Sequence, residues 1–158
     1  MGTDIHIHLE YRSRKTKQYK YGGKIRGERI YDIFDAMALD EDKNSGDVFF
    51  QSRGLPGDVT QATLKEYRMW KEDAHHASWL STIEFSACIV EAYIRMNSFE
   101  RLQFLKQYEE LFTIINTAFL KSKKQEEDCL LSYIELLKLM ISYEEDQEEC
   151  RIVFWFDN

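Results

Sequence analysis

Polar and apolar side chains alternate strictly at the start of the chain. From residue 4 to residue 11 the even positions are polar and the odd positions are apolar (Asp4, His6, His8 and Glu10; Ile5, Ile7, Leu9 and Tyr11). Because successive side chains of a strand point to opposite faces, this pattern predicts a β-strand with one polar and one apolar face. The same alternation in residues 151–157 predicts a closing strand with both faces partly buried, and its natural partner is the first strand.

The residues between these two strands follow a mostly helical period. A basic turn at residues 13–17 and a return strand at Gln18–Tyr21, ending at Gly22-Gly23, predict a hairpin. Ser81 and Glu84 have the spacing of a capping box. Apolar residues spaced by three or four predict four to five helices, at residues 28–39, 58–70, 82–95, 98–119 and 130–141. Residues 40–58 show neither period and are expected to form a long loop.

These elements predict one α+β domain that comprises residues 1–158. We expect a small antiparallel sheet, in which the N-terminal hairpin pairs with the C-terminal strand, packed by its apolar face against a bundle of four to five helices. The chain has 158 residues, of which 44% are hydrophobic and 14% aromatic. That length and composition suffice for a packed core and argue against wholesale disorder.

Charge is distributed unevenly in this acidic chain. The net charge is -7, yet residues 12–29 contain eight basic residues and one acid, so this segment carries +7 and the remainder -14. An exposed basic cluster attracts anions or acidic partners; the alternative is a solvated hairpin tip. A nucleic-acid partner is disfavoured because the strongly acidic remainder would repel a long polyanion.

Cysteine usage and hydropathy predict a cytoplasmic location. Cys88, Cys129 and Cys150 lie far apart and form no CxxC motif, as expected of free thiols in a reducing compartment. The sequence has no apolar run near the roughly 18 residues that a membrane span requires, and no basic leader followed by an apolar segment. We therefore expect neither secretion nor membrane insertion.

The four histidines fall in two short segments, at residues 6–8 and 75–76. Imidazole and carboxylate groups are suitable ligands for Zn, Mn, Fe or Ni, and a bound divalent ion can activate water. Neighbours in the first-strand row lie about 7 Å apart, so a complete site needs a second segment. We therefore hypothesise a divalent metal held by Asp4, His6 and His75. The alternative is a half-exposed polar strand face and a structural histidine pair.

Four short motifs stand out along the chain: MGTDIHIHLE at the start, RGLPGDV at residues 53–59, HHASWL at residues 75–80 and IVFWFDN near the end. With these motifs the chain resembles a group of small phage and prophage proteins of uncharacterised activity, which implies the cytosol of a bacterial host. The resemblance implies that the first strand, the loop around Arg53 and Asp58, and the second histidine segment share a site. Such a set is suited to a phosphorylated or otherwise anionic small molecule, with Arg53 as a planar, bidentate clamp. The alternative for residues 53–58 is a rigid turn followed by a helix cap.

Two functions are compatible with these residues. In the first, an accessory phage-type protein binds a ligand or a host protein through its polar Asp/His strand face, with Glu10, Asp58 and His76 among the contacts. In the second, a small metal-dependent hydrolase acts on a phosphoester or another anionic substrate, with His8 or Asp73 as the general base and Arg53 steadying the anion. We favour the first because no complete catalytic signature is present.

Overall fold

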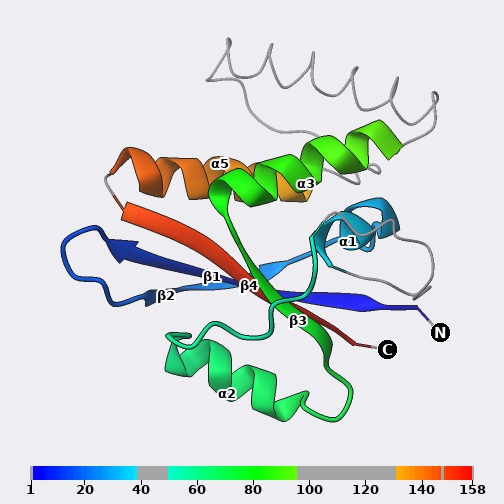
Figure 1. Ribbon diagram of the computed structural model, residues 1–158, viewed down its shortest axis with the longest axis horizontal. Helices are drawn as coiled ribbons and strands as arrows, with labels where there is room; N and C mark the ends of the chain where they lie inside the picture. The colour runs from blue at the N-terminus through cyan, green and yellow to red at the C-terminus, as the bar shows by residue number, and fades with distance from the viewer. Residues whose placement is uncertain (1, 39–49, 96–130, 147, 158) are drawn as a thin grey trace, which may run out of the picture.

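The computed structural model describes residues 2–38, 50–95, 131–146 and 148–157 (Figure 1). The helix expected at residues 98–119, most of the loop expected at residues 40–58, and Cys129 lie outside this part of the chain. The described residues form an α+β fold with a four-stranded sheet and four helices, which confirms the predicted fold class. None of the described helices is long and apolar enough to cross a membrane.

The sheet is antiparallel throughout and places the two terminal strands at its centre. Its order is β2-β1-β4-β3. The strands are β1 (Asp4–Ser13), β2 (Lys20–Arg26), β3 (His75–Ser81) and β4 (Glu148–Asp157). The pairing of β1 with β4 is continuous from Asp4 opposite Asp157 to Ser13 opposite Glu148, which confirms the predicted partnership of the two ends.

The apolar face of the sheet packs against three helices, α1 (Tyr31–Met37), α3 (Thr82–Arg95) and α5 (Leu131–Glu145) (Figure 1). The alternation in β1 directs its odd residues into this layer, and β4 contributes its even residues. Burial of these side chains provides most of the driving force for folding. The strand side chains in this core are Ile5, Ile7, Leu9, Leu80, Ile152, Phe154 and Phe156.

The polar face of the sheet is covered as well, by α2 (Gln61–Met69) (Figure 1). This corrects the expectation that helices pack only over the apolar face. Helix α2 has a single fully buried residue, Thr63, so an apolar stripe does not explain its position. Thr60 caps the helix through Thr63 N, and both hydroxyls also donate to Glu10 in β1. Polar contacts therefore fix the start of α2 on the sheet.

Strand β2 differs from the predicted return strand. The prediction ended at Gly22-Gly23, whereas the strand begins at Lys20, passes through both glycines and ends at Arg26. Gly23 has a φ of +132°, and the pairing register shifts between Leu9 and Glu10. Glycine tolerates the backbone conformations that occur at β-bulges. The two glycines therefore accommodate an irregularity within the hairpin and do not end it.

Strand β3 is an element that the sequence pattern did not predict. The sequence suggests a connection between two helices at residues 73–81, but residues 75–81 pair with β4. The register of β3 shifts between His75 and Ser78, and His76 has a φ of +48°. This bulge interrupts the alternation of side chains that would have marked a strand. The predicted capping box follows directly, with Ser81 N donating to Glu84 Oε2 over 2.9 Å, and α3 begins at Thr82 as expected.

Candidate functional site

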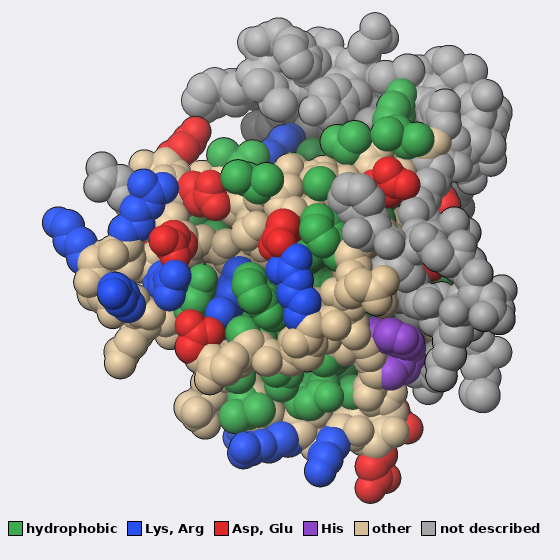
Figure 2. Space-filling model, in the orientation of Figure 1, with side chains coloured by type: hydrophobic (Ala, Val, Ile, Leu, Met, Phe, Trp, Pro, Cys, Tyr) green, Lys and Arg blue, Asp and Glu red, His purple; other side chains and the backbone are tan. Residues whose placement is uncertain are grey.

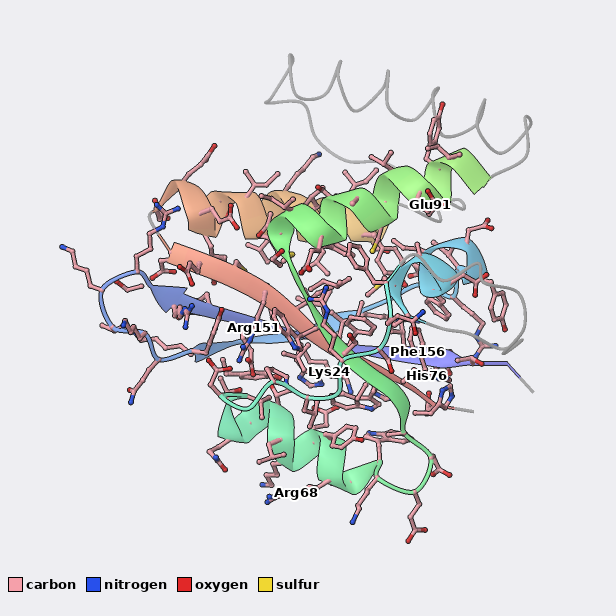
Figure 3. All side chains as sticks on the ribbon, viewed as in Figure 1. Lys24, Arg68, His76, Glu91, Arg151 and Phe156 are labelled. Atoms are coloured by element: carbon pink, nitrogen blue, oxygen red, sulfur yellow. The ribbon has the colours of Figure 1, made fainter. Side chains whose placement is uncertain are left out.

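The polar row of β1 lies beneath α2 and changes from exposed to buried along the strand. Asp4 is exposed, His6 is 8% exposed, and His8 and Glu10 are fully buried. The prediction that these four residues share one face is confirmed by their cross-strand partners in β4, which are Asp157, Trp155, Val153 and Arg151. The face is more deeply buried than the half-exposed alternative supposed, because α2 covers it. Figure 3 shows Lys24 and Arg151 in this layer, whereas Arg68 of α2 points away from the sheet.

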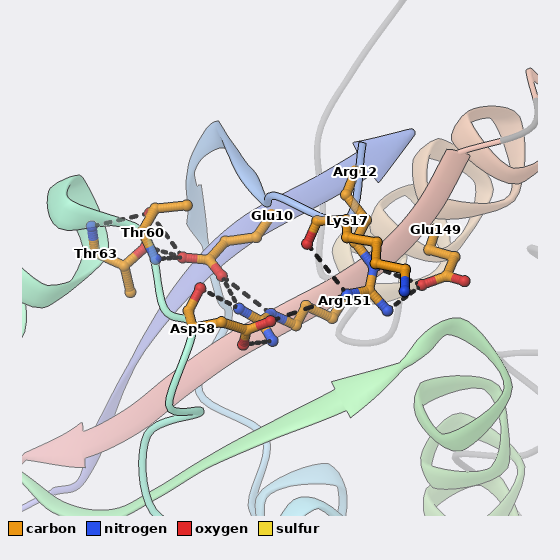
Figure 4. A network of polar contacts seen from close by, with 8 residues as sticks. All are labelled: Glu10, Arg12, Lys17, Asp58, Thr60, Thr63, Glu149 and Arg151. Carbon is orange, nitrogen blue, oxygen red and sulfur yellow. Dashed lines mark hydrogen bonds and ion pairs between the residues drawn. The ribbon is translucent and has the colours of Figure 1, made fainter. Parts of the chain in front are cut away.

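Glu10 is committed to a buried polar network (Figure 4). Arg151 donates through Nε and Nη2 to Oε2 of Glu10, over 3.0 and 2.7 Å. The other carboxylate oxygen, Oε1, accepts from the backbone and hydroxyl of Thr60 and from the hydroxyl of Thr63, over 2.9, 2.7 and 2.8 Å. Both oxygens of Glu10 are thereby satisfied. Glu10, which was predicted to contact a ligand, instead attaches the start of α2 to the sheet.

Asp58 belongs to the same network and lies at its exposed edge. Arg151 Nη1 donates to Asp58 Oδ1 over 2.7 Å, and the side chain of Asp58 is 54% exposed. Burial on its own would raise the pKa of this carboxyl, but the hydrogen bond and charge of Arg151 outweigh that effect and the pKa is lowered. Nearby, Arg12 pairs with Glu149 over 2.5 Å, so some of the basic hairpin charge is neutralised by the acidic C-terminal segment (Figure 4). Figure 2 shows acidic side chains interspersed among the basic ones on this side of the molecule.

His8 is a neutral imidazole enclosed by aromatic and charged groups. Its ring stacks on Trp155 with the centroids 4.9 Å apart, and its Nδ1 lies 3.2 Å from the hydroxyl of Tyr21. Burial lowers the pKa of His8 to about 4, against the opposing charge of Glu66, whose Oε2 lies 3.7 Å from Nε2. Glu66 also pairs with Lys24. His8 is therefore uncharged at neutral pH.

His6 forms part of the wall of an open pocket at the end of the sheet. We call this cavity, of about 690 Å³, the strand-end pocket; its polar and aromatic lining is Asp4, His6, Lys24, Arg26, Glu28, Arg29, Trp70 and Asp157. The His6 ring lies between two indoles, 4.5 Å from the centroid of Trp70 and 5.4 Å from that of Trp155. Neither ring nitrogen of His6 has a hydrogen bond within the described residues, although Nε2 lies 3.4 Å from Asp157 Oδ2.

Within the described residues, one basic side chain of the strand-end pocket has no carboxylate partner. Arg29 donates to Asp4 over 2.6 Å, and Lys24 pairs with Glu66. The guanidinium of Arg26 has no ion pair within the part of the chain that the structure describes. Arg26 is the cross-strand neighbour of His6, so its side chain starts on the same face of the sheet.

The second histidine segment does not meet the first. His75 pairs with Phe156 across the sheet and stacks on its ring at 6.1 Å, and Phe156 in turn contacts Phe34 of α1. His6 stacks on Trp155, which precedes Phe156 in β4. Consecutive side chains of a strand point to opposite faces of the sheet, so Trp155 and His6 lie on the face opposite Phe156. The expected set of Asp4, His6 and His75 is therefore divided between the two faces. Within the described ranges, no group of three His, Cys, Asp or Glu side chains is placed to hold a metal ion.

The remaining predicted residues lie outside the strand-end pocket. Nδ1 of His75 and Nδ1 of His76 are 2.6 Å apart, so the pair contact each other (His76 is labelled in Figure 3). Asp73 is exposed, and its backbone amide donates to Trp70 O. Arg53 forms a bidentate ion pair with Glu84, at 2.5 and 3.1 Å, and lies over the ring of Trp79. Its planar guanidinium therefore holds the start of α3, a role that neither the anion clamp nor the rigid turn with a helix cap had anticipated.

Asp157 is one of the pocket residues that the sequence analysis missed, together with Arg26 and Trp70. It ends β4, faces Asp4 across the strand pair, and its side chain is 14% exposed. The signal was present, because pairing the two predicted terminal strands in antiparallel fashion brings the last acid of the chain to the first acidic position of β1.

Comparison with known proteins adds no relative: no protein-family model, no curated protein and no solved structure matches this chain.

Proposed function

We propose that this protein is a phage-type accessory protein that binds a small anionic ligand in the strand-end pocket. The observation that carries the proposal is His6, which is 92% buried, lines the pocket and leaves both ring nitrogens without a hydrogen bond within the described residues. Buried polar groups are nearly always paired, so an unpaired imidazole at a pocket wall indicates a missing partner. The resemblance of the chain, at both of its ends, to small phage proteins supports the accessory role.

The lining holds three basic and three acidic side chains, so the preference for an anion rests on Arg26. Arg26 has no ion pair within the described part of the chain and starts beside His6, and its fork of donors fits a carboxylate or phosphate. Trp70 adds a part-exposed indole next to the imidazole, which suits a ligand with a flat apolar portion. Among the two functions considered, the hydrolase requires His75 beside Asp4 and His6, and these residues lie on different faces of the sheet.

Substituting Arg26 by glutamine is expected to weaken anion binding roughly tenfold or more, because a charged hydrogen bond in the pocket would be lost. The probes are inorganic phosphate, pyrophosphate and adenosine monophosphate, each titrated into ¹⁵N-labelled protein. The readouts are the ring nitrogens of His6 and the indole NH of Trp70, which should shift in a saturable manner with at least one probe.

Lys20→Gln is the matched control, because Lys20 is an exposed cation on the same strand that does not line the pocket. We expect this variant to bind as the wild type does. Equal weakening in both variants would indicate non-specific attraction to the basic hairpin. The proposal is overturned by that result, or if none of the three probes shifts the His6 and Trp70 resonances at millimolar concentration.

A further inference from the structure

Strand β2 forms an open edge of the sheet. It pairs with β1 on one side, and no described strand or loop is hydrogen-bonded to its backbone on the other side. None of its seven residues is buried, and five are exposed. The β3 edge differs, because Gly54 N donates to Ala77 O over 2.8 Å and Arg53 N donates to Ser78 Oγ over 3.2 Å. An edge strand with free N–H and C=O groups is a template on which another extended chain can pair.

The middle of β2 leaves room for a second backbone. Gly22 and Gly23 carry no side chains, and no heavy atom beyond the chain neighbours lies within 4 Å of the position that a Cβ of Gly23 would occupy. Glycine inside a strand can mark a place where another backbone approaches closely, in addition to accommodating a bulge. An incoming strand therefore meets no side chain at this point of the edge.

The side chains of β2 define which strand can pair there. Lys24 and Arg26 lie opposite His8 and His6, on the polar face of the sheet, and Ile25 packs against the core on the other face. A neighbouring strand places its alternate side chains beside these two sets. Acidic residues on one face would pair with the two cations, and apolar residues on the other would extend the core beside Ile25.

Charge favours an acidic partner over a second copy of this chain. Residues 12–29 carry a net charge of +7, so two copies of β2 paired edge to edge would bring like charges together. Positive side chains on an edge strand oppose such self-pairing, whereas they attract an acidic chain. The exposed side chains of Arg14, Lys15 and Lys17 at the hairpin tip add to the positive field.

We propose that the open edge of β2 binds an extended segment of a partner protein in which acidic and apolar residues alternate, and that this segment pairs as a further strand of the sheet. Backbone hydrogen bonds provide the affinity, and the alternating side chains provide the specificity. The inference does not depend on an anion in the strand-end pocket. Lys24 and Arg26 also line that pocket, so the role of the peptide backbone distinguishes the two modes of binding.

The probe is a seven-residue peptide, as long as β2, in which glutamate alternates with valine, titrated into ¹⁵N-labelled protein. Alternate backbone amides of β2 are expected to shift and to become protected from hydrogen exchange, because successive amides of a strand point to opposite edges. The same peptide with N-methylated amides should not bind, since it cannot donate hydrogen bonds to β2. A peptide with glutamine in place of glutamate should bind about fivefold more weakly, because its ion pairs are lost.

The double variant Lys24→Gln with Arg26→Gln should weaken binding of the glutamate peptide by about the same factor of five. Arg14→Gln with Lys15→Gln is the matched control, since it removes two exposed cations from the hairpin tip, outside β2, and should bind nearly as the wild type does. Thermal unfolding of both variants is compared with that of the wild type. If the β2 variant does not fold, the glutamine peptide on the wild type measures the same loss of charge.

Four results would overturn the inference. The first is that the glutamate peptide does not bind, and the second is that the N-methylated peptide binds equally well, which would mean that its acids bind without forming a strand. The third is equal weakening in the hairpin-tip variant, which would indicate non-specific attraction. The fourth is a dimer paired through β2 in the absence of peptide, which would assign this edge to a second copy of the chain.

Discussion

Replacing Arg151 by methionine is expected to lower the free energy of unfolding by about 3 to 5 kcal/mol. Arg151 is 4% exposed and Glu10 is fully buried, so the variant would leave the Glu10 carboxylate charged in a site that water does not reach. Removing one partner of a buried ion pair costs far more than the pair itself contributes, because the desolvated charge loses its compensation. Urea unfolding followed by circular dichroism measures the difference.

Arg12→Met is the matched control for this prediction. Arg12 also pairs with a carboxylate of the C-terminal strand, Glu149, but the two side chains are 28% and 46% exposed. The loss of that pair should cost only about 0 to 1 kcal/mol. The double variant Glu10→Gln with Arg151→Met should recover part of the stability, because the buried charge is gone while an oxygen remains for Thr60 and Thr63. An Arg151→Met loss as small as that of Arg12→Met would contradict the argument.

The Glu10 network links the stability of the fold to the strand-end pocket. Glu10 holds the first turn of α2 through Thr60 and Thr63, and the opposite end of α2 places Trp70 against His6 in the strand-end pocket. The helix buries only one residue completely, so its position depends on these polar and aromatic contacts. Loss of the network is therefore expected to loosen the pocket wall in molecules that remain folded.

Local patterns predicted the elements whose signals are contained within a few residues. The alternation of β1 gave its two faces correctly, and the Ser81 to Glu84 capping box located the first residue of α3. Pairing of the terminal strands also followed from their matching alternation. Each of these features depends on side-chain period or on a cap, which is information that a short stretch of sequence carries.

Features that depend on tertiary contacts could not be read in the same way. The face occupied by His75 depends on a bulge in β3, and one additional residue reverses the direction of every side chain beyond it. The clustering of histidines in the sequence therefore suggested a metal site, but the residues of that site lie on opposite faces of the sheet. The position of α2 depends on where Glu10 finds donors fifty residues away in the chain, and no periodicity encodes that.

The stability of the protein is expected to fall by about 3 kcal/mol as the pH is lowered from neutrality to about 4, through His8. The pKa of His8 is lowered from 6.5 to about 4, first by burial and then by the charges of Lys24 and His6, while Glu66 and Glu10 oppose the shift. Between these two values the unfolded chain binds the proton and the folded chain does not. Stability therefore rises with pH across this window and is lost on acidification.

His8→Phe removes the titrating group and keeps a ring to stack on Trp155, so its stability should be nearly independent of pH from 6.5 to 4.5. Urea unfolding of both proteins at steps of pH, with a chelator present to exclude bound metal, measures the difference. Carboxylates with a lowered pKa, such as Glu66 with its Lys24 partner, lose their stabilisation only below the ordinary value of 4.5 and do not contribute in this range. Parallel curves for the two proteins would mean that the imidazole is hydrated or paired when folded, and α2 would then not seal the polar face of the sheet.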